Sequence, residues 1–269
     1  MPKIAVAGKG GVGKTTFSGV LARVLAAAGQ KVYAIDADPN PTLGQALGFP
    51  PDLLEKIVPV VEMRDLIEER TGARPGESGA YFRLNPRVDD IPERFSVSYQ
   101  GVHLLEMGTV KGAGAGCVCP ENTVLRALVT HLLLREKETV LLDMVAGVEH
   151  LGRGTAAAVD AMYVVVEPGQ RSLMVAADIE RMAGELGVPA VWVVANKVRD
   201  DDDLAFVTEY VEHGRRQEGG DPPGRGGLAG WLPRDEHVVD ADMRGVAVYD
   251  AAPEVARRVE DIARRTGLI

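Results

Sequence analysis

The chain has 269 residues, of which 46% are hydrophobic and 26% are charged, an ordinary composition for a globular protein. Its formal net charge of −9 makes free nucleic acid and anionic membrane poor partners. No apolar run is long enough to span a bilayer and the N-terminus enters a predicted strand at once, so we expect a cytoplasmic protein without a signal peptide. This length suits one α/β domain over residues 1–269.

Residues 8–16 match the phosphate-loop pattern G-x-x-x-x-G-K-[ST]. In this pattern backbone N–H groups surround phosphate oxygens, the lysine (Lys14) carries charge to the β and γ phosphates, and the hydroxyl of Thr15 ligates Mg²⁺. A phosphate loop is expected between a strand and a helix, and the flanking sequence fits this. Lys3–Ala7 is predicted to be a buried strand, and Thr15–Ala28 is predicted to be a helix whose N-terminus faces the anion. We therefore predict that ATP or ADP contacts the following residues: Gly8, Lys9, Gly10, Gly11, Val12, Gly13, Lys14, Thr15 and Thr16.

Strand-like and helix-like segments alternate along the rest of the chain. The predicted strands are Lys31–Asp36, Val102–Met107, Val140–Asp143, Ala161–Glu167, Ala190–Ala195 and Leu228–Pro233. The predicted helices are Glu121–Arg135, Ser172–Leu186, Asp203–Arg216 and Pro253–Thr266. This alternation predicts the α/β fold of a P-loop NTPase, with a mostly parallel central sheet and helices on both faces.

Four stretches are less regular. Pro41–Arg70 is predicted to be helical with proline interruptions, and Thr71–Gln100 to be an ordered excursion on the nucleotide face. Gly108–Pro120 is a glycine-rich loop, and Glu218–Gly227 is predicted to be a mobile surface turn.

The charge pattern of the last predicted helix distinguishes a docked helix from a membrane anchor. Val255, Val259 and Ile262 recur at core-facing spacing, and arginines alternate with acids on the remaining positions. This mixed charge favours a helix docked on the protein over a basic membrane anchor.

Three aspartates stand where predicted strands end. Asp38 is predicted to orient the attacking water, and Asp143, which closes an apolar strand, to contact the Mg²⁺ shell through water. Asp36 would hold the metal's water shell or brace the loop, with a helix-capping role as the alternative. With Lys14, these residues supply charge neutralisation and water positioning, so we predict an enzyme that hydrolyses ATP.

The two cysteines of the chain, Cys117 and Cys119, form a C-x-C pair in the glycine-rich loop. Two thiolates do not complete a four-ligand site for Zn²⁺ or Ni²⁺, whereas a two-fold dimer supplies the pair twice. We therefore predict a metal shared across a homodimer, with two buried structural cysteines as the alternative.

The sequence K-G-G-V-G-K-T-T resembles the deviant Walker A of the MinD/ParA/nitrogenase-iron-protein class of P-loop ATPases. The resemblance implies that Lys9 crosses a dimer interface to the partner's ATP, a catalytic role, and that Asp38 lies in switch I and Asp143–Gly147 in switch II. It also implies that Asn196 reads the adenine edge, with a capping asparagine as the alternative; Lys197 is predicted to contact the nucleotide with it.

A narrower resemblance rests on G-C-V-C-P-E-N at residues 116–122 and D-M-V-A-G-V-E-H-L-G-R-G-T at residues 143–155. Both are similar to the CooC family, ATPases that assist nickel insertion into carbon monoxide dehydrogenase; one departure is Val145, where that family usually has an acid. The resemblance implies ATP-driven dimerisation, Ni²⁺ or Zn²⁺ at Cys117 and Cys119, and a dehydrogenase or related metalloenzyme as client. An iron–sulfur reductase like the nitrogenase iron protein and a ParA/MinD-type positioning ATPase are the alternatives.

Overall fold

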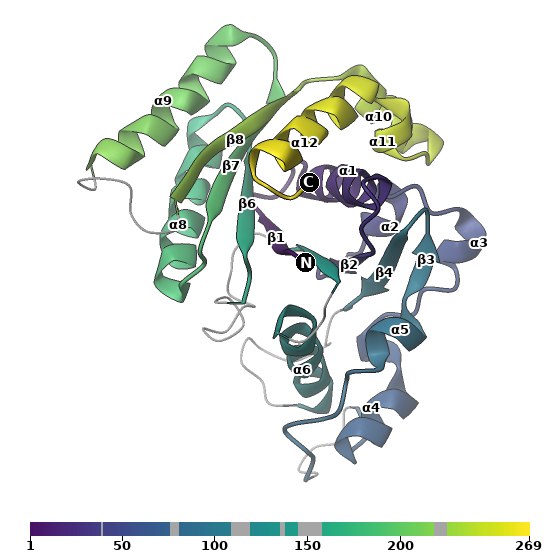
Figure 1. Cartoon of the computed structure of the whole chain (residues 1–269). Helices are drawn as coiled ribbons and strands as arrows, with labels where there is room; N and C mark the ends of the chain where they lie inside the picture. The colour runs from purple at the N-terminus through teal and green to yellow at the C-terminus, as the bar shows by residue number, and fades with distance from the viewer. Residues whose placement is uncertain (39, 76–80, 109–118, 135–137, 145–157, 218–224) are drawn as a thin grey trace.

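The computed structural model describes the chain except residues 39, 76–80, 109–118, 135–137, 145–157 and 218–224. Eight strands form one sheet in the order β3-β4-β2-β5-β1-β6-β7-β8 (Figure 1). The strands are β1 (Lys3–Ala7), β2 (Val32–Asp36), β3 (Val97–Tyr99), β4 (Val102–Glu106), β5 (Thr139–Asp143), β6 (Ala161–Val166), β7 (Val191–Val198) and β8 (Arg225–Pro233). Every neighbouring pair is parallel except β3 with β4, which confirms the predicted fold class.

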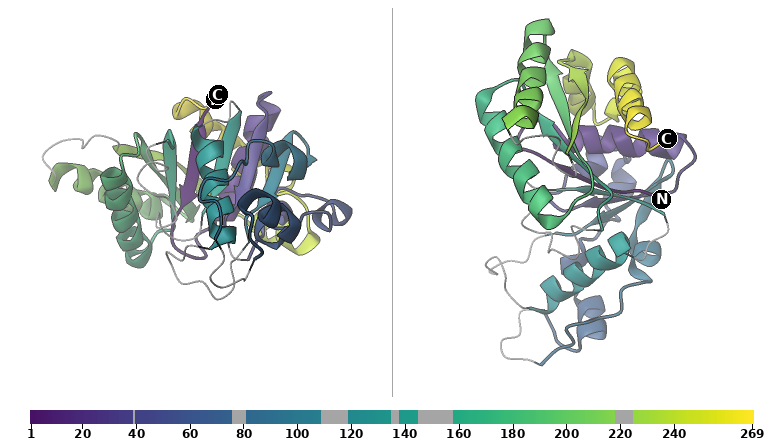
Figure 2. Two further views of the ribbon diagram at one scale, coloured as in Figure 1. Left: turned by 90° about the horizontal axis from the view of Figure 1, so that it is seen from below. Right: turned by 60° about the vertical axis from the view of Figure 1, so that its left-hand side comes forward.

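Helices cover both faces of this sheet (Figure 2). The α-helices are α1 (Lys14–Ala27), α2 (Leu43–Ala46), α3 (Pro51–Leu54), α4 (Arg64–Thr71), α5 (Ile91–Phe95), α6 (Pro120–Leu134), α8 (Gln170–Leu186), α9 (Asp201–Gln217), α10 (Glu236–Arg244), α11 (Val248–Ala251) and α12 (Pro253–Arg265), and η1 (Val60–Glu62) is a 3₁₀ turn. Alternate strand residues enter two separate cores. Ile4 and Val6 pack on the side of α1 and α12, and Ala5 and Ala7 on the side of α6 and α8.

The C-terminal helix α12 docks as its apolar spacing predicts. Val255, Val259 and Ile262 are at most 2% exposed and lie in the core shared with α1. No helix among the described residues is long and apolar enough to cross a membrane.

The irregular stretches differ in detail from the predictions. Residues 41–71 form three short helices and a 3₁₀ turn, because prolines at 50, 51 and 59 interrupt them. The excursion at 71–100 contains α5 and β3, which the sequence analysis missed, and it also missed α10 and α11. Residues 225–227, predicted as part of a turn, are the start of β8, where they pair with β7; the rest of that prediction lies outside the described residues.

Candidate nucleotide-binding site

The predicted phosphate loop lies between the end of β1 and the start of α1. Gly8 (φ 144°) and Gly13 (φ 95°) adopt backbone conformations that favour glycine. A Cβ atom at Gly8 would overlap the carbonyl oxygen of Val165, and one at Gly13 would overlap the side chain of Asn196. The loop is therefore packed tightly against the ends of β6 and β7, and its glycines are needed for that approach.

The two lysines of the loop are placed differently. Lys14 begins α1, and its Nζ lies 3.4 Å from the carbonyl oxygen of Lys9, on the inside of the loop. The amide of Val12 also points to this carbonyl, at 3.4 Å. The Lys9 side chain is partly exposed. The Val12 amide and the Lys14 ammonium thus meet at one carbonyl of the loop, beside the N-terminus of α1, and a helix N-terminus is a place where anions bind.

Asp143 ends β5 next to the start of α1. Its Oδ1 accepts a hydrogen bond from the Ser18 hydroxyl at 2.9 Å, and the Thr15 hydroxyl also donates to its carboxylate. Burial raises the pKa of Asp143 to about 6, against these two hydrogen bonds. The pairing of Thr15 with a buried acid fits the donor set that Mg²⁺ prefers beside nucleotide phosphates, so Thr15 and, through water, Asp143 would hold that ion. Ser18 was missed by the sequence analysis, because a serine inside a helix carries no motif.

Asp36 and Asp38 have distinct surroundings. Asp36 is fully buried and accepts backbone N–H groups from Asp38 at 3.0 Å and from Thr42 and Leu43 at 2.9 Å each. Burial raises the pKa of Asp36 and these amides oppose the shift. Thr42 and Leu43 begin α2, so Oδ2 of Asp36 caps that helix, as its predicted helix-capping alternative has it, while Oδ1 holds the amide of Asp38. The Asp38 carboxylate accepts only the exposed amide of Asn40 among the hydrogen bonds of the described residues, at 2.9 Å.

A third strand-end acid, Glu106, escaped the sequence analysis. In the register of the sheet Asp36 pairs with both Glu106 and Asp143, so three acids stand side by side on β4, β2 and β5. Burial, together with the charges of Asp36 and Glu62, raises the pKa of Glu106 to about 7. The backbone continues this row: Met107 donates to the Asp36 carbonyl at 2.9 Å. The only sequence signal was that V-H-L-L-E ends in an acid, as V-L-L-D does.

Asn196 and Lys197, at the end of β7, contact the loop rather than a distant surface. Asn196 donates from Nδ2 to the carbonyl of Val12 at 2.7 Å, and its Oδ1 accepts the Lys197 amide at 2.9 Å. Lys197 Nζ donates to the carbonyl of Gly11 at 2.6 Å and lies 3.4 Å from a carboxylate oxygen of Glu167. Adenine recognition by Asn196 stays a prediction, and its contact with Val12 gives it a second role as a support of the loop.

A cavity of about 520 Å³ opens beside the phosphate loop. Gly13 and Thr16 form one end of it, and the remaining walls come from β7, β8, α9, α10 and α12 and from the segments that follow β6, β7 and β8. The residues on those walls are Glu167, Pro168, Asn196, Lys197, Arg199, Asp203, Leu232, Pro233, Arg234, Asp235, Val238 and Val239, with Val255 from α12. Its size and its mixture of apolar and polar groups suit a nucleoside.

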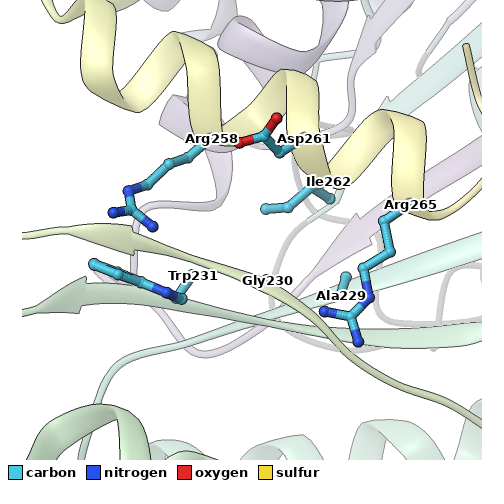
Figure 3. A pocket seen from close by; sticks show the side chains of 7 residues that line it. All are labelled: Ala229, Gly230, Trp231, Arg258, Asp261, Ile262 and Arg265. Atoms are coloured by element: carbon cyan, nitrogen blue, oxygen red, sulfur yellow. The ribbon is translucent and has the colours of Figure 1, made fainter. Parts of the chain in front are cut away.

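A second, smaller cavity of about 180 Å³ lies between β8 and α12 (Figure 3). Arg258 stacks over the indole of Trp231, with its guanidinium carbon 3.4 Å from the ring centroid. None of its lining residues borders the cavity beside the phosphate loop. This cavity is therefore separate from the predicted nucleotide site.

The cysteine pair is described in part. Cys119 lies immediately before α6, and its carbonyl accepts the Thr123 amide at 3.0 Å. Cys117 and the predicted switch II residues after Met144 lie outside the described residues. Within the described part of the chain no three metal-ligating side chains gather into a site. The shared metal site therefore stays a prediction.

Comparison with known proteins gives the family. A family model described as the CobQ/CobB/MinD/ParA nucleotide binding domain matches residues 3–248. The chain is also 47% identical over 251 residues to the carbon monoxide dehydrogenase accessory protein CooC of Rhodospirillum rubrum, covering 93% of this chain and 90% of that protein. This chain is a CooC-type member of the MinD/ParA nucleotide-binding family.

Other relatives support the same family at greater distance. An ATP-binding protein of Methanocaldococcus jannaschii is 40% identical to this CooC-type chain, covering 97% of this chain and 95% of that one. MinD in the MinC:MinD complex of Aquifex aeolicus superposes with a TM-score of 0.69 over 100% of this chain and 96% of that one, at 20% identity. At that identity the likeness concerns the fold alone.

The raised pKa of Glu106 leads to a prediction about stability. Its pKa lies above the ordinary value of 4.5, so the folded state holds a proton that the unfolded chain releases, and stability falls as pH rises from about 4.5 to about 7. Replacing this carboxylate in Glu106→Gln should raise the melting temperature of the nucleotide-free protein at pH 8 and leave it unchanged near pH 4. Thermal melts across this range measure the effect, with the exposed Glu55→Gln as control. A gain that is equal at both pH values would contradict the assignment.

Proposed function

We propose that this chain is an ATP-hydrolysing accessory protein of the cytoplasm that takes part in the maturation of carbon monoxide dehydrogenase or a related metalloenzyme. The observation that carries the proposal is the identity of 47% with the Rhodospirillum rubrum accessory protein, which extends over 93% of this chain. The complete phosphate loop and the acids beside it supply the chemistry that such a role requires.

Hydrolysis of ATP follows from the charges around the loop. Lys14 neutralises phosphate charge, and Thr15 and Asp143 would hold Mg²⁺, whose positive charge is the chemistry that this ion supplies to phosphoryl transfer. Asp38 stands on a segment that Asp36 fixes through backbone amides, and its own carboxylate takes little part in internal bonding. We assign to Asp38 the orientation of the attacking water, because its oxygens are available to accept a proton or a hydrogen bond from that water.

Two substitutions separate binding from chemistry. Lys14→Ala removes a phosphate contact and should lose both ATP affinity and turnover, whereas Asp38→Asn should bind ATP normally and lose turnover by about a hundredfold or more. Phosphate release and nucleotide titration measure the two effects, and the exposed Asp52→Asn serves as control. Unchanged turnover in Asp38→Asn would remove Asp38 from the mechanism.

Lys9 provides the proposed link between nucleotide and assembly. The loop already holds the ammonium of Lys14 on its inner side, and the Lys9 carbonyl rather than its side chain faces that group. A second lysine of the same loop adds little to the neutralisation of its own nucleotide, whereas it can neutralise the phosphates bound by a partner subunit. We therefore propose that ATP closes a homodimer in which each Lys9 contacts the partner's nucleotide.

Dimerisation is testable by light scattering with a slowly hydrolysed ATP analogue and Mg²⁺. Wild type should double in mass on addition of the analogue, while Lys9→Ala should bind it and stay monomeric. Lys56→Ala, at an exposed lysine on another surface, is the control. Equal dimerisation of wild type and Lys9→Ala would leave Lys9 without a role in assembly.

The metal is proposed as cargo, held by Cys117 and Cys119 of both chains. Four thiolates complete a site for Ni²⁺ or Zn²⁺ that one chain lacks, and the resemblance of the cysteine segment to the CooC family favours nickel. Because nucleotide and metal would both favour the dimer, each must change the affinity for the other by the same factor.

Metal titration decides this part of the proposal. About one Ni²⁺ or Zn²⁺ should bind per two chains, more weakly as pH falls because the thiols must lose protons. Cys117→Ser/Cys119→Ser should lose the binding and keep ATP affinity. One tightly bound ion per chain would overturn the shared site, and an iron–sulfur chromophore in protein purified without oxygen would favour the reductase alternative.

A further inference from the structure

Lys197 has an unusual backbone conformation for a residue at the end of a strand. Its φ is 58°, and among the described residues only Gln100, at φ 49°, is another non-glycine residue with positive φ. Gln100 lies in the tight turn between β3 and β4, where Gly101 follows, so its conformation has a local explanation. Lys197 lies inside β7, at the irregularity in the pairing of β7 with β8 between Ala195 and Val198. Side chains other than glycine rarely adopt this region without a constraint from their surroundings.

At this irregularity β7 contacts the phosphate loop. In a regular strand the side chains of residues 196 and 197 would point to opposite faces of the sheet. The left-handed conformation breaks this alternation, and both side chains reach the same loop. Lys197 Nζ donates a hydrogen bond to the Gly11 carbonyl at 2.6 Å. Asn196 Nδ2 donates to the next carbonyl, that of Val12, at 2.7 Å.

Fixing these carbonyls also fixes the amides of the loop. In a trans peptide the C=O of one residue and the N–H of the next point in opposite directions. The hold of Lys197 on the Gly11 carbonyl therefore turns the Val12 N–H away from Lys197. That amide donates to the Lys9 carbonyl at 3.4 Å, and Lys14 Nζ contacts the same carbonyl. By the same geometry the hydrogen bond from Asn196 to the Val12 carbonyl turns the Gly13 N–H away from Asn196.

Glu167 keeps the Lys197 ammonium in place. Its carboxylate, at the end of β6, lies 3.4 Å from Nζ, and both side chains are partly exposed. The ammonium thus lies between the carboxylate of Glu167, directly after β6, and the Gly11 carbonyl of the loop.

We propose that Lys197 is a positioning residue: by holding the Gly11 carbonyl it keeps the peptide planes of the phosphate loop in the shape that binds nucleotide, while its own backbone takes a left-handed conformation. This role rests on the proposed ATP binding and hydrolysis at the loop. It acts through the loop, so it concerns every nucleotide whose α and β phosphates lie in it, ADP as much as ATP.

The experiment uses two variants of Lys197 and one matched control. Lys197→Met keeps the length of the side chain and removes the donor, and Lys197→Gly removes the donor and relieves the strained backbone. Gln100→Gly relieves the same kind of strain far from the loop. Calorimetric titration gives the affinities for ATP and ADP, and thermal melts of the nucleotide-free proteins give their stability.

Both Lys197 variants should bind ATP and ADP about tenfold more weakly, by one common factor, the size expected for losing a hydrogen bond from a charged group. Lys197→Gly should nevertheless melt no lower than wild type, because strain is relieved as the bond is lost. Gln100→Gly should keep wild-type affinity.

Three results would overturn the proposal: wild-type affinity in both Lys197 variants, weaker binding of ATP alone, or a Lys197→Gly protein that loses stability together with affinity. The second would indicate direct contact with the γ-phosphate, and the third a general structural role. Failure of the wild type to bind ATP would instead remove the proposed function itself.

Discussion

The structure depends on one requirement, that several peptide N–H groups of a short turn point to the same place while no covalent bond holds them there. Glycines allow the turn, but they also leave it free to adopt other shapes. Contacts with neighbouring strands restrict this freedom. The ends of β6 and β7 press against Gly8 and Gly13, and the side chains of β7 occupy the carbonyls of the turn. Amides that are oriented in advance bind phosphate without the cost of reorganising around it.

A second constraint is the crowding of negative charge beside this positive site. Glu106, Asp36 and Asp143 end three adjacent strands, and burial raises the pKa of each. Asp36 is compensated by three backbone amides and Asp143 by two hydroxyls, whereas the charges that act on Glu106 from the described residues are those of the acids Asp36 and Glu62. A proton or a cation stabilises such an edge, which agrees with the proposal that Mg²⁺ binds here together with the nucleotide.

The sequence was informative wherever a function rests on neighbouring residues. The phosphate loop, the apolar strands and the docked face of α12 are local patterns, and their period predicts the fold. It was uninformative where partners are distant. Asn196 and Lys197 reach the loop over more than 180 residues, with separations of 184 and 186, and no spacing rule predicts such contacts. The strand β3 has three residues, too few for a period, and Glu106 resembles any acid at the end of a strand until its neighbours in the sheet are known.

The strand order also has a consequence for biosynthesis. β1 is made before its two neighbours in the sheet, β5 and β6, which begin at Thr139 and Ala161. The phosphate loop waits still longer for its supports on β7, which ends at Val198. β1 must therefore remain without its neighbours until β5 and β6 have been made, and until then it exposes apolar side chains that chaperones can bind. Nucleotide can bind firmly only after β7 has joined the sheet. Nucleotide binding therefore stabilises a nascent chain only when most of the sheet has formed.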